Sequence, residues 1–140
     1  MKAECVFCDS DGGLEVYRDE CCRVVIADDP IPGFCRVVWN AHVREMTDLP
    51  AADRRHVMDV VFAVEAALRE FLRPDKMNVA SLGNLVPHVH WHVVPRFATD
   101  AHFPSPVWSA PQRKAEVRAL PPNFAQRLAA RLAADFETQG

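Results

Sequence analysis

The sequence has no long apolar run and no stretch rich in Lys and Arg, and each absence excludes a class of protein. No apolar run approaches the roughly 20 residues that cross a bilayer, so we expect no membrane partner. The net charge of -3, without clustered basic residues, argues against a nucleic acid polymer as partner. Residues 1–5 carry a charged pair with no apolar stretch behind it, which predicts a cytoplasmic protein without a signal peptide.

The cysteines do not make a disulfide framework. There are five of them, an odd number, and a reducing cytoplasm disfavours disulfides. We therefore interpret them as thiols or metal ligands. The hydrophobic share of 49% and the charged share of 25% are typical of a soluble globular protein. A length of 140 residues predicts one domain spanning residues 1–140.

Hydrophobic periodicity predicts five strands and two helices. The apolar runs that fit strands fall at 14–17, 22–27, 34–39, 77–82 and 89–94. Apolar residues at helical spacing predict a long amphipathic helix over 50–72 and a terminal helix over 123–136. The proline-rich stretch 95–122 predicts irregular structure. This order favours an α+β fold, in which the long helix covers an antiparallel sheet.

The most specific feature is a row of three histidines, His88, His90 and His92, separated by Val89 and Trp91. Alternate side chains of a strand share one face, so the three imidazoles line up while the apolar residues face the core. Imidazoles in such a row suit either metal binding or attack at a phosphorus centre. The spacing alone does not choose between the two.

Residues 88–94 resemble the defining motif of the histidine triad (HIT) proteins, in which three histidines alternate with apolar residues. The resemblance covers about residues 4–97, including the segment 27–42 and the loop 78–83, and residues 104–108 are similar to tails of some bacterial members. It implies a HIT-like fold, a small-molecule nucleotide substrate, a homodimer and no organic cofactor. It also implies a hydrolase that cleaves a dinucleoside polyphosphate, a phosphoramidate or a nucleotidyl ester.

The resemblance assigns roles to the histidines. His90 matches the nucleophile that attacks the α-phosphorus and forms a nucleotidyl-histidine, which water then cleaves. The main-chain carbonyl of His88 matches the partner of its second ring nitrogen. His92 matches the residue that contacts the phosphate and helps to protonate the leaving group.

The resemblance also implies a set of nucleotide-binding residues. Asn78 and the backbone around Gly83 and Asn84 match positions that hold phosphate oxygens. Leu85 departs from the pattern, because many members have a Ser there, and one hydroxyl contact is lost.

Two further matches concern the ribose and the base. Asp28 or Asp29 matches the acid that binds the ribose; we prefer Asp28, although either also fits a solvated turn. Val6 and Phe7 match positions that pack on the base, and ordinary core packing explains them nearly as well.

Cys5 and Cys8 have the spacing of a zinc-binding pair, but two ligands do not complete a site. Family members with this pair complete it at positions that match His42 and His88, which implies a structural zinc ion. A redox-active pair is the competing interpretation, and the turn-forming residues after Cys8 do not favour it. The other cysteines, Cys21, Cys22 and Cys35, fit small buried apolar positions, and His56 and His102 have no partner at an informative spacing.

Three other functions compete with hydrolysis. A transferase would pass the nucleotidyl group to phosphate or a sugar phosphate, and a regulatory module would bind nucleotide with only incidental turnover. A metal-dependent enzyme of the cupin type would place an acid four residues after His92, where Arg96 stands instead.

Overall fold

The computed structural model describes residues 5–137, so the predicted absence of a signal peptide in residues 1–4 lies outside the described part of the chain. Its centre is a five-stranded antiparallel sheet in the order β1-β2-β3-β5-β4. The strands are β1 (Leu14–Arg18), β2 (Cys22–Ile26), β3 (Cys35–Trp39), β4 (Lys76–Ala80) and β5 (His90–Arg96). The predicted α+β class with an antiparallel sheet is therefore confirmed.

The predicted strand ends differ from the observed ends at the histidines. The fifth strand was predicted over 89–94 but runs from His90 to Arg96, so His88 precedes it. Strand β4 ends at Ala80 rather than at Leu82, which lengthens the loop between β4 and β5. Two short helices, α1 (Val6–Asp9) and the 3-10 helix η1 (Met46–Asp48), have too few residues to show a helical period in the sequence.

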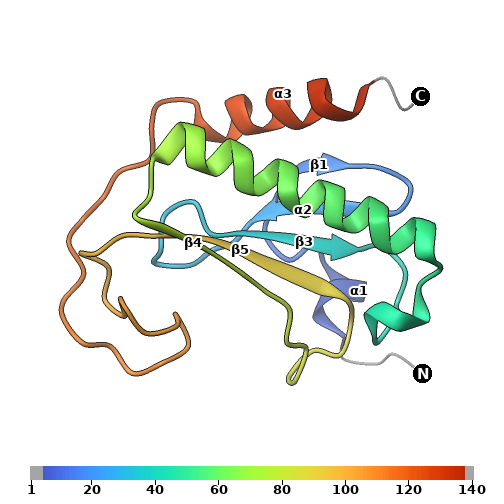
Figure 1. The fold of residues 1–140 in the computed structure, drawn as a ribbon, viewed down its shortest axis with the longest axis horizontal. Coiled ribbons are helices and arrows are strands. Elements are labelled where there is room, and N and C mark those ends of the chain that lie inside the picture. The colour runs from blue at the N-terminus through green and yellow to red at the C-terminus, as the bar shows by residue number, and fades with distance from the viewer. Residues whose placement is uncertain (1–4, 138–140) are drawn as a thin grey trace.

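Helix α2 (Ala51–Leu72) lies across one face of the sheet, as Figure 1 shows. It follows Pro50, and it ends where Arg73 adopts a left-handed conformation and Pro74 prevents continuation. Its apolar stripe, including Val57, Val64 and Leu68, is fully buried in the main core against the sheet. The spacing of these side chains explains why the helix was predictable.

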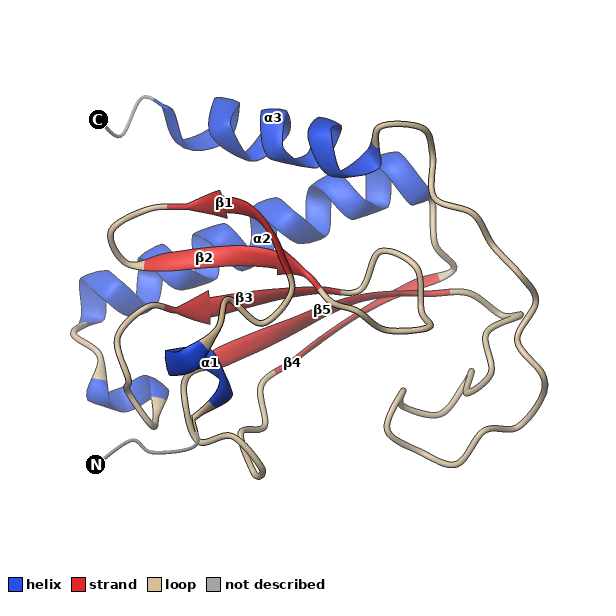
Figure 2. Cartoon of the chain, turned by 180° about the vertical axis from the view of Figure 1, so that it is seen from behind, coloured by secondary structure: helices blue, strands red, loops and turns tan. Residues whose placement is uncertain are grey.

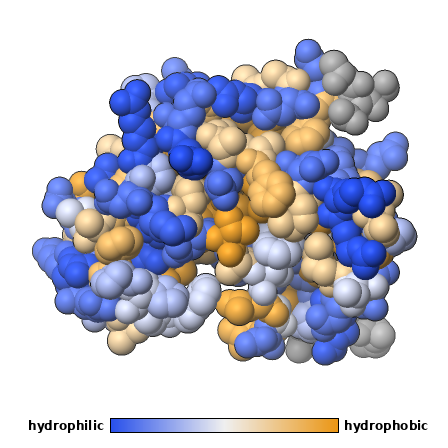
Figure 3. All heavy atoms as spheres, in the orientation of Figure 1, coloured by the Kyte–Doolittle hydropathy of each residue, from blue (hydrophilic) through white to orange (hydrophobic). Residues whose placement is uncertain are grey.

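Helix α3 (Phe124–Phe136) packs on the same side as α2, and Leu128 and Leu132 belong to the same core (Figure 1). Apolar surface remains near the middle of this side in Figure 3, between hydrophilic regions. None of the described helices is both long and apolar enough to cross a membrane. The segment between β5 and α3 has no helix or strand, as predicted.

Figure 2 shows α1 on the other face of the sheet. Two smaller apolar clusters also lie on this face. The first cluster consists of Cys5, Phe7, Val25 and Val38. The second lies toward the opposite end of the strands and consists of Ala27, Ile31, Phe34 and Val94, with Val107 packed against it. The side chains of His90 and His92 share this face, because they pair across the strands with Val38 and Arg36. We call it the histidine face.

A buried ion pair fixes the start of the irregular segment at the end of β5. Nε and Nη2 of Arg96 donate hydrogen bonds of 2.9 and 3.0 Å to the two carboxylate oxygens of Asp100, and both residues are buried. Burial alone would raise the pKa of Asp100. Hydrogen bonds from Arg96 and from the backbone amides of His102, Phe103 and Phe97 outweigh it and lower the pKa to about 2.

Replacing Asp100 by Asn should lower the free energy of unfolding by about 3 kcal/mol at neutral pH, because Arg96 stays buried without its counter-charge. The folded pKa lies below the ordinary value of about 3.9. The ionised carboxylate therefore stabilises the fold above about pH 4, and this contribution is lost as the pH falls toward 2. Urea unfolding at neutral and at low pH measures both effects. The gap between wild type and Asp100→Asn should narrow at low pH, and a constant gap would contradict this assignment.

Candidate functional site

The first residue of β5, His90, has a ring whose orientation leaves one nitrogen free for chemistry. Its Nδ1 lies 2.6 Å from the carbonyl oxygen of His88, so Nδ1 carries the proton and donates it to that oxygen. The lone pair is then on Nε2, which forms no hydrogen bond with any residue between 5 and 137. Burial lowers the pKa of His90, even though the bond to His88 opposes this shift. A neutral imidazole with a directed lone pair is a competent nucleophile.

The ring of Phe7 covers His90. The two ring centroids are 4.6 Å apart, and the residue His90 is 6% exposed, so a reactant reaches it only at an uncovered edge. Phe7 lies in α1, and the loop that follows this helix contains Gly12, which has a φ of 89°. A side chain at Gly12 would place its first carbon 2.5 Å from the ring of Phe7. Glycine is therefore required for Phe7 to occupy this position.

Beside His90 on the same face lies His92, whose ring centroid is 5.0 Å away. Its Nδ1 is buried and has no hydrogen-bond partner among the described residues, which is rare for a structural histidine. Burial, together with the charges of His90 and Arg36, lowers the pKa of His92 to about 4. His92 is therefore neutral at neutral pH, and a bound phosphate would shift its pKa back upward.

A cation opposite His92 was missed by the sequence reasoning. Arg36 on β3 pairs directly with His92 on β5. Its guanidinium lies 5.2 Å from the centre of the Phe34 ring and donates a 3.2 Å hydrogen bond to the carbonyl oxygen of Gly12. This is its only hydrogen bond to the described residues, so further donors remain for a ligand. In the sequence, Arg36 is only a basic residue within the apolar strand predicted over 34–39, and nothing there indicates a role in the site.

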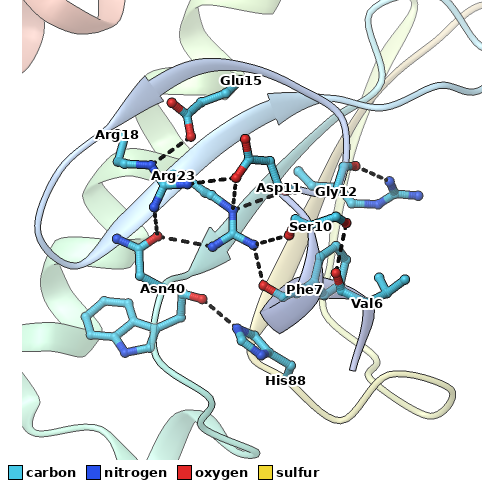
Figure 4. Close-up of polar contacts among 12 residues, drawn as sticks. Val6, Phe7, Ser10, Asp11, Gly12, Glu15, Arg18, Arg23, Asn40 and His88 are labelled. Atoms are coloured by element: carbon cyan, nitrogen blue, oxygen red, sulfur yellow. Dashed lines mark hydrogen bonds and ion pairs between the residues drawn. The ribbon is translucent and has the colours of Figure 1, made fainter. Parts of the chain in front are cut away.

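A second arginine, Arg23 on β2, holds the N-terminal segment against the sheet (Figure 4). Its guanidinium is buried and donates to the carbonyl oxygens of Phe7 at 2.6 Å, Ser10 at 3.0 Å and Asp11 at 3.1 Å. It also donates to the side-chain oxygen of Asn40 at 3.2 Å. These bonds satisfy a buried charge and fix the backbone that carries the Phe7 ring.

The four residues predicted to hold zinc come together at the N-terminal end of β5. Each of Cys5, Cys8, His42 and His88 offers one ligand atom, and the four atoms lie within 4.8 Å of one another. Nδ1 of His88 is 3.4 Å from Sγ of Cys5, 3.5 Å from Sγ of Cys8 and 3.2 Å from Nδ1 of His42. A tetrahedral zinc ion with ordinary bond lengths separates its ligands by about 3.5 Å. The donor set and its spacing therefore fit zinc.

The orientation of His88 supports the same interpretation. Its Nε2 donates a 2.6 Å hydrogen bond to the main-chain carbonyl of Trp39. The lone pair is therefore on Nδ1, the nitrogen that lies near the sulfur atoms of the two cysteines. Metal-binding histidines commonly direct their second nitrogen to such a carbonyl. Burial also lowers the pKa of His88, which favours the neutral form that a metal requires.

Two of the predicted nucleotide-binding residues are oriented by the fold. The side-chain oxygen of Asn78 accepts a 2.8 Å hydrogen bond from Arg96, which leaves its NH₂ group as a donor. The carboxylate of Asp29 accepts a 3.0 Å bond from the backbone amide of Ile31, whereas Asp28 is exposed and forms no described hydrogen bond. Asp28 is therefore the freer of the two acids.

The remaining predicted binding residues are more open. Gly83 and Asn84 line a hollow together with Leu85 and Arg44, and no hydrogen bond or ring contact within residues 5–137 joins them to the histidines. Leu85, at the usual Ser position, is 97% exposed. Val6 is exposed as well, so only Phe7 of the predicted base-contacting pair packs at the histidines.

Other cysteines and histidines take structural positions. Cys22 and Cys35 are fully buried, as predicted, and Cys21 is partly buried. His56 received no role from the sequence, but its Nε2 lies 2.6 Å from the carboxylate of Asp19. That carboxylate also caps the hairpin by accepting from the amides of Cys21 and Cys22, so the contact joins α2 to the hairpin.

Comparisons with known proteins agree on one family. The family profile of the HIT domain matches residues 13–99, a range that holds all three histidines of the row. An AP-4-A phosphorylase of Mycobacterium tuberculosis is 32% identical over 98 residues, which is 65% of this chain and 50% of that protein. The chain thus spans about half the length of the curated relatives that it matches.

Solved structures share the fold. A histidine triad protein from Bradyrhizobium japonicum superposes with a TM-score of 0.70 at 27% identity, covering 89% of this chain and 90% of that one. A zinc-bound histidine triad family protein from Mycobacterium smegmatis covers 100% of both chains at 24% identity, with a TM-score of 0.64. The second likeness supports the fold alone.

Proposed function

The chain belongs to the HIT domain family, and from this premise we propose that it cleaves a nucleoside phosphate derivative through a covalent nucleotidyl-histidine on His90. The substrate class is a dinucleoside polyphosphate, a phosphoramidate or a nucleotidyl ester. The observation that carries the proposal is the 2.6 Å hydrogen bond from Nδ1 of His90 to the carbonyl of His88. It directs the lone pair of Nε2 away from the backbone and toward a reactant.

In the first step, Nε2 of His90 donates its electron pair to the α-phosphorus, and the bond from phosphorus to the leaving group breaks. The leaving group keeps that electron pair and takes a proton, for which His92 is the nearest positioned donor. Asn78 contributes its free amide to the phosphate oxygens, and Asp28 binds the ribose. Arg36 adds a fixed positive charge beside the reacting phosphate.

In the second step, an acceptor attacks the same phosphorus, and the bond between phosphorus and nitrogen breaks. The electron pair returns to Nε2, which restores the enzyme. Water as the acceptor makes the protein a hydrolase. Inorganic phosphate would make it a transferase, and the name of the mycobacterial relative, a phosphorylase, favours testing this alternative.

The metal has a structural role in this proposal. Cys5, Cys8, His42 and His88 would hold zinc, and a bound ion would supply a rigid link between the N-terminal segment and the residue whose carbonyl orients His90. No bond-making step requires it.

Incubation with diadenosine tetraphosphate or with adenosine 5′-phosphoramidate, in the presence and absence of inorganic phosphate, tests the proposal. We expect turnover with a protein-bound adenylate that survives alkali and is lost in acid, as a phosphorus–nitrogen bond predicts. In water alone the tetraphosphate should yield AMP and ATP, and the phosphoramidate should yield AMP and ammonia. Formation of ADP only when phosphate is present would identify a phosphorylase, and binding without turnover of either substrate would favour a regulatory module.

A further inference from the structure

A hollow of about 370 Å³ lies between the β2–β3 loop and the irregular segment that follows β5. We propose that this hollow binds the second nucleoside of a dinucleoside polyphosphate, an inference that rests on the proposed function. Its volume falls in the range of small-molecule sites. Residues from both segments line it, among them Asp29, Ile31, Phe97, His102, Val107 and Arg118.

The hollow begins where the histidine row ends. His90, His92 and Val94 alternate along one face of β5, and Ile31 and Val107 pack in one cluster with Val94. Along a strand, Val94 lies about 13 Å beyond His90, a distance that a chain of several phosphate groups can bridge. A substrate whose α-phosphorus lies at His90 can therefore extend along the histidine face into the hollow.

The lining of the hollow suits a heterocyclic ring. The central carbon of the Arg118 guanidinium lies over the Phe97 ring, 3.8 Å from the ring centroid. Bases stack on aromatic rings and on guanidinium planes of this kind. Nδ1 of His102 is buried and has no hydrogen-bond partner among the described residues, so this side of the hollow has an unsatisfied polar group.

The charges of the hollow favour a nucleoside over another phosphate. Asp29 and Glu116 contribute two carboxylates and Arg118 contributes one cation, while Asp100 is already neutralised by Arg96. A phosphate group would be repelled by the excess of negative charge. The hydroxyl and amino groups of an uncharged nucleoside can instead donate hydrogen bonds to the carboxylates.

The test compares diadenosine tetraphosphate, which has a second nucleoside, with adenosine 5′-phosphoramidate, which has none. Arg118→Ala removes the stacking cation, and Ala115→Trp fills the hollow from its rim. Each variant should raise KM for the tetraphosphate about tenfold and leave KM and kcat for the phosphoramidate unchanged. Lys114→Ala removes the same charge from an exposed neighbour that does not line the hollow, and it should change neither substrate.

The outcomes separate this inference from the proposed function. Suppose that the wild type cleaves both substrates, and that Arg118→Ala and Ala115→Trp change KM equally for both or for neither. This result would overturn the second nucleoside site and would leave the proposed function standing. Turnover of the phosphoramidate alone would overturn the inference as well. If neither substrate is cleaved, the proposed function and the inference fall together.

Discussion

The His90→Ala variant should lose nucleotide turnover by about a thousandfold or more while keeping its fold. Nδ1 of this imidazole donates a 2.6 Å hydrogen bond to the carbonyl oxygen of His88, which leaves the lone pair on Nε2 for attack on phosphorus. Without it no covalent intermediate forms, and water would have to attack the bound nucleotide directly. Steady-state kinetics on diadenosine tetraphosphate and trapping of the protein-bound adenylate measure the loss.

His90→Asn is the matched variant for this prediction. The asparagine amide can still donate to the carbonyl of His88, so the backbone stays satisfied, but the side chain has no nucleophilic lone pair. His56→Asn is the control, since His56 contacts Asp19 and not the histidine row, and it should keep its activity. More than a tenth of the wild-type rate in His90→Asn, on any substrate of the class, would show that His90 is not the nucleophile.

The parts of the fold that the sequence predicted are those with a local period. Alternation along residues 89–94 placed His90 and His92 on one face of a strand, and the helical spacing of Val57, Val64 and Leu68 placed α2 on the sheet. The sequence could not show that the strand begins only at His90. That boundary depends on hydrogen bonds to distant segments, such as the bond from the amide of Val89 to Val43.

The arginines around the site were not predictable for a related reason. Arg23 and Arg36 lie in apolar strands, and their partners, Phe7 and Gly12, come from a segment far away in the sequence. A buried cation gives no periodic signal, because its position depends on carbonyl oxygens that only the tertiary fold brings near. Resemblance to a family motif predicted roles for the histidines and named the four candidate zinc ligands. The resemblance did not predict Arg23 and Arg36, the two arginines that lie near these residues in the fold.

The hollow beside Asp29 was not predictable from the sequence either, because a whole segment of the chain forms one of its walls. The irregular stretch 95–122 was predicted, but a lack of regular structure does not say where a segment packs. Its position is fixed by Arg96, which binds Asp100 and the carbonyl of Ser105 at 2.8 Å. In the sequence, the position of Arg96 four residues after His92 argues only against a cupin-type metal site. In the fold it places one wall of a candidate binding site and orients Asn78.

Removing the predicted zinc ion should lower the stability of the fold substantially. Cys5→Ser should abolish zinc binding and lower Tm by about 10 °C or more, because the loss of about 3 kcal/mol shifts Tm by roughly 3 °C per kcal/mol in a chain of this size. Cys5 is buried, and its sulfur lies 3.4 Å from Nδ1 of His88. A water molecule could replace this sulfur as a ligand only if the surrounding side chains lost their packing. Metal analysis of the purified protein and thermal unfolding with and without chelator measure the two effects.

The comparison with chelator separates zinc from packing. Chelator should lower the Tm of wild type toward that of Cys5→Ser and leave the Tm of the variant unchanged. Cys21→Ser, outside the cluster, should bind zinc as wild type does.

A second comparison separates a structural zinc site at the cysteines from a metal site at the histidine row. His92→Ala should retain one zinc ion per chain, because His92 is not among the four clustered ligands. Loss of the metal from that variant would place the ion at the histidine row and contradict both the structural zinc site and nucleophilic attack by His90.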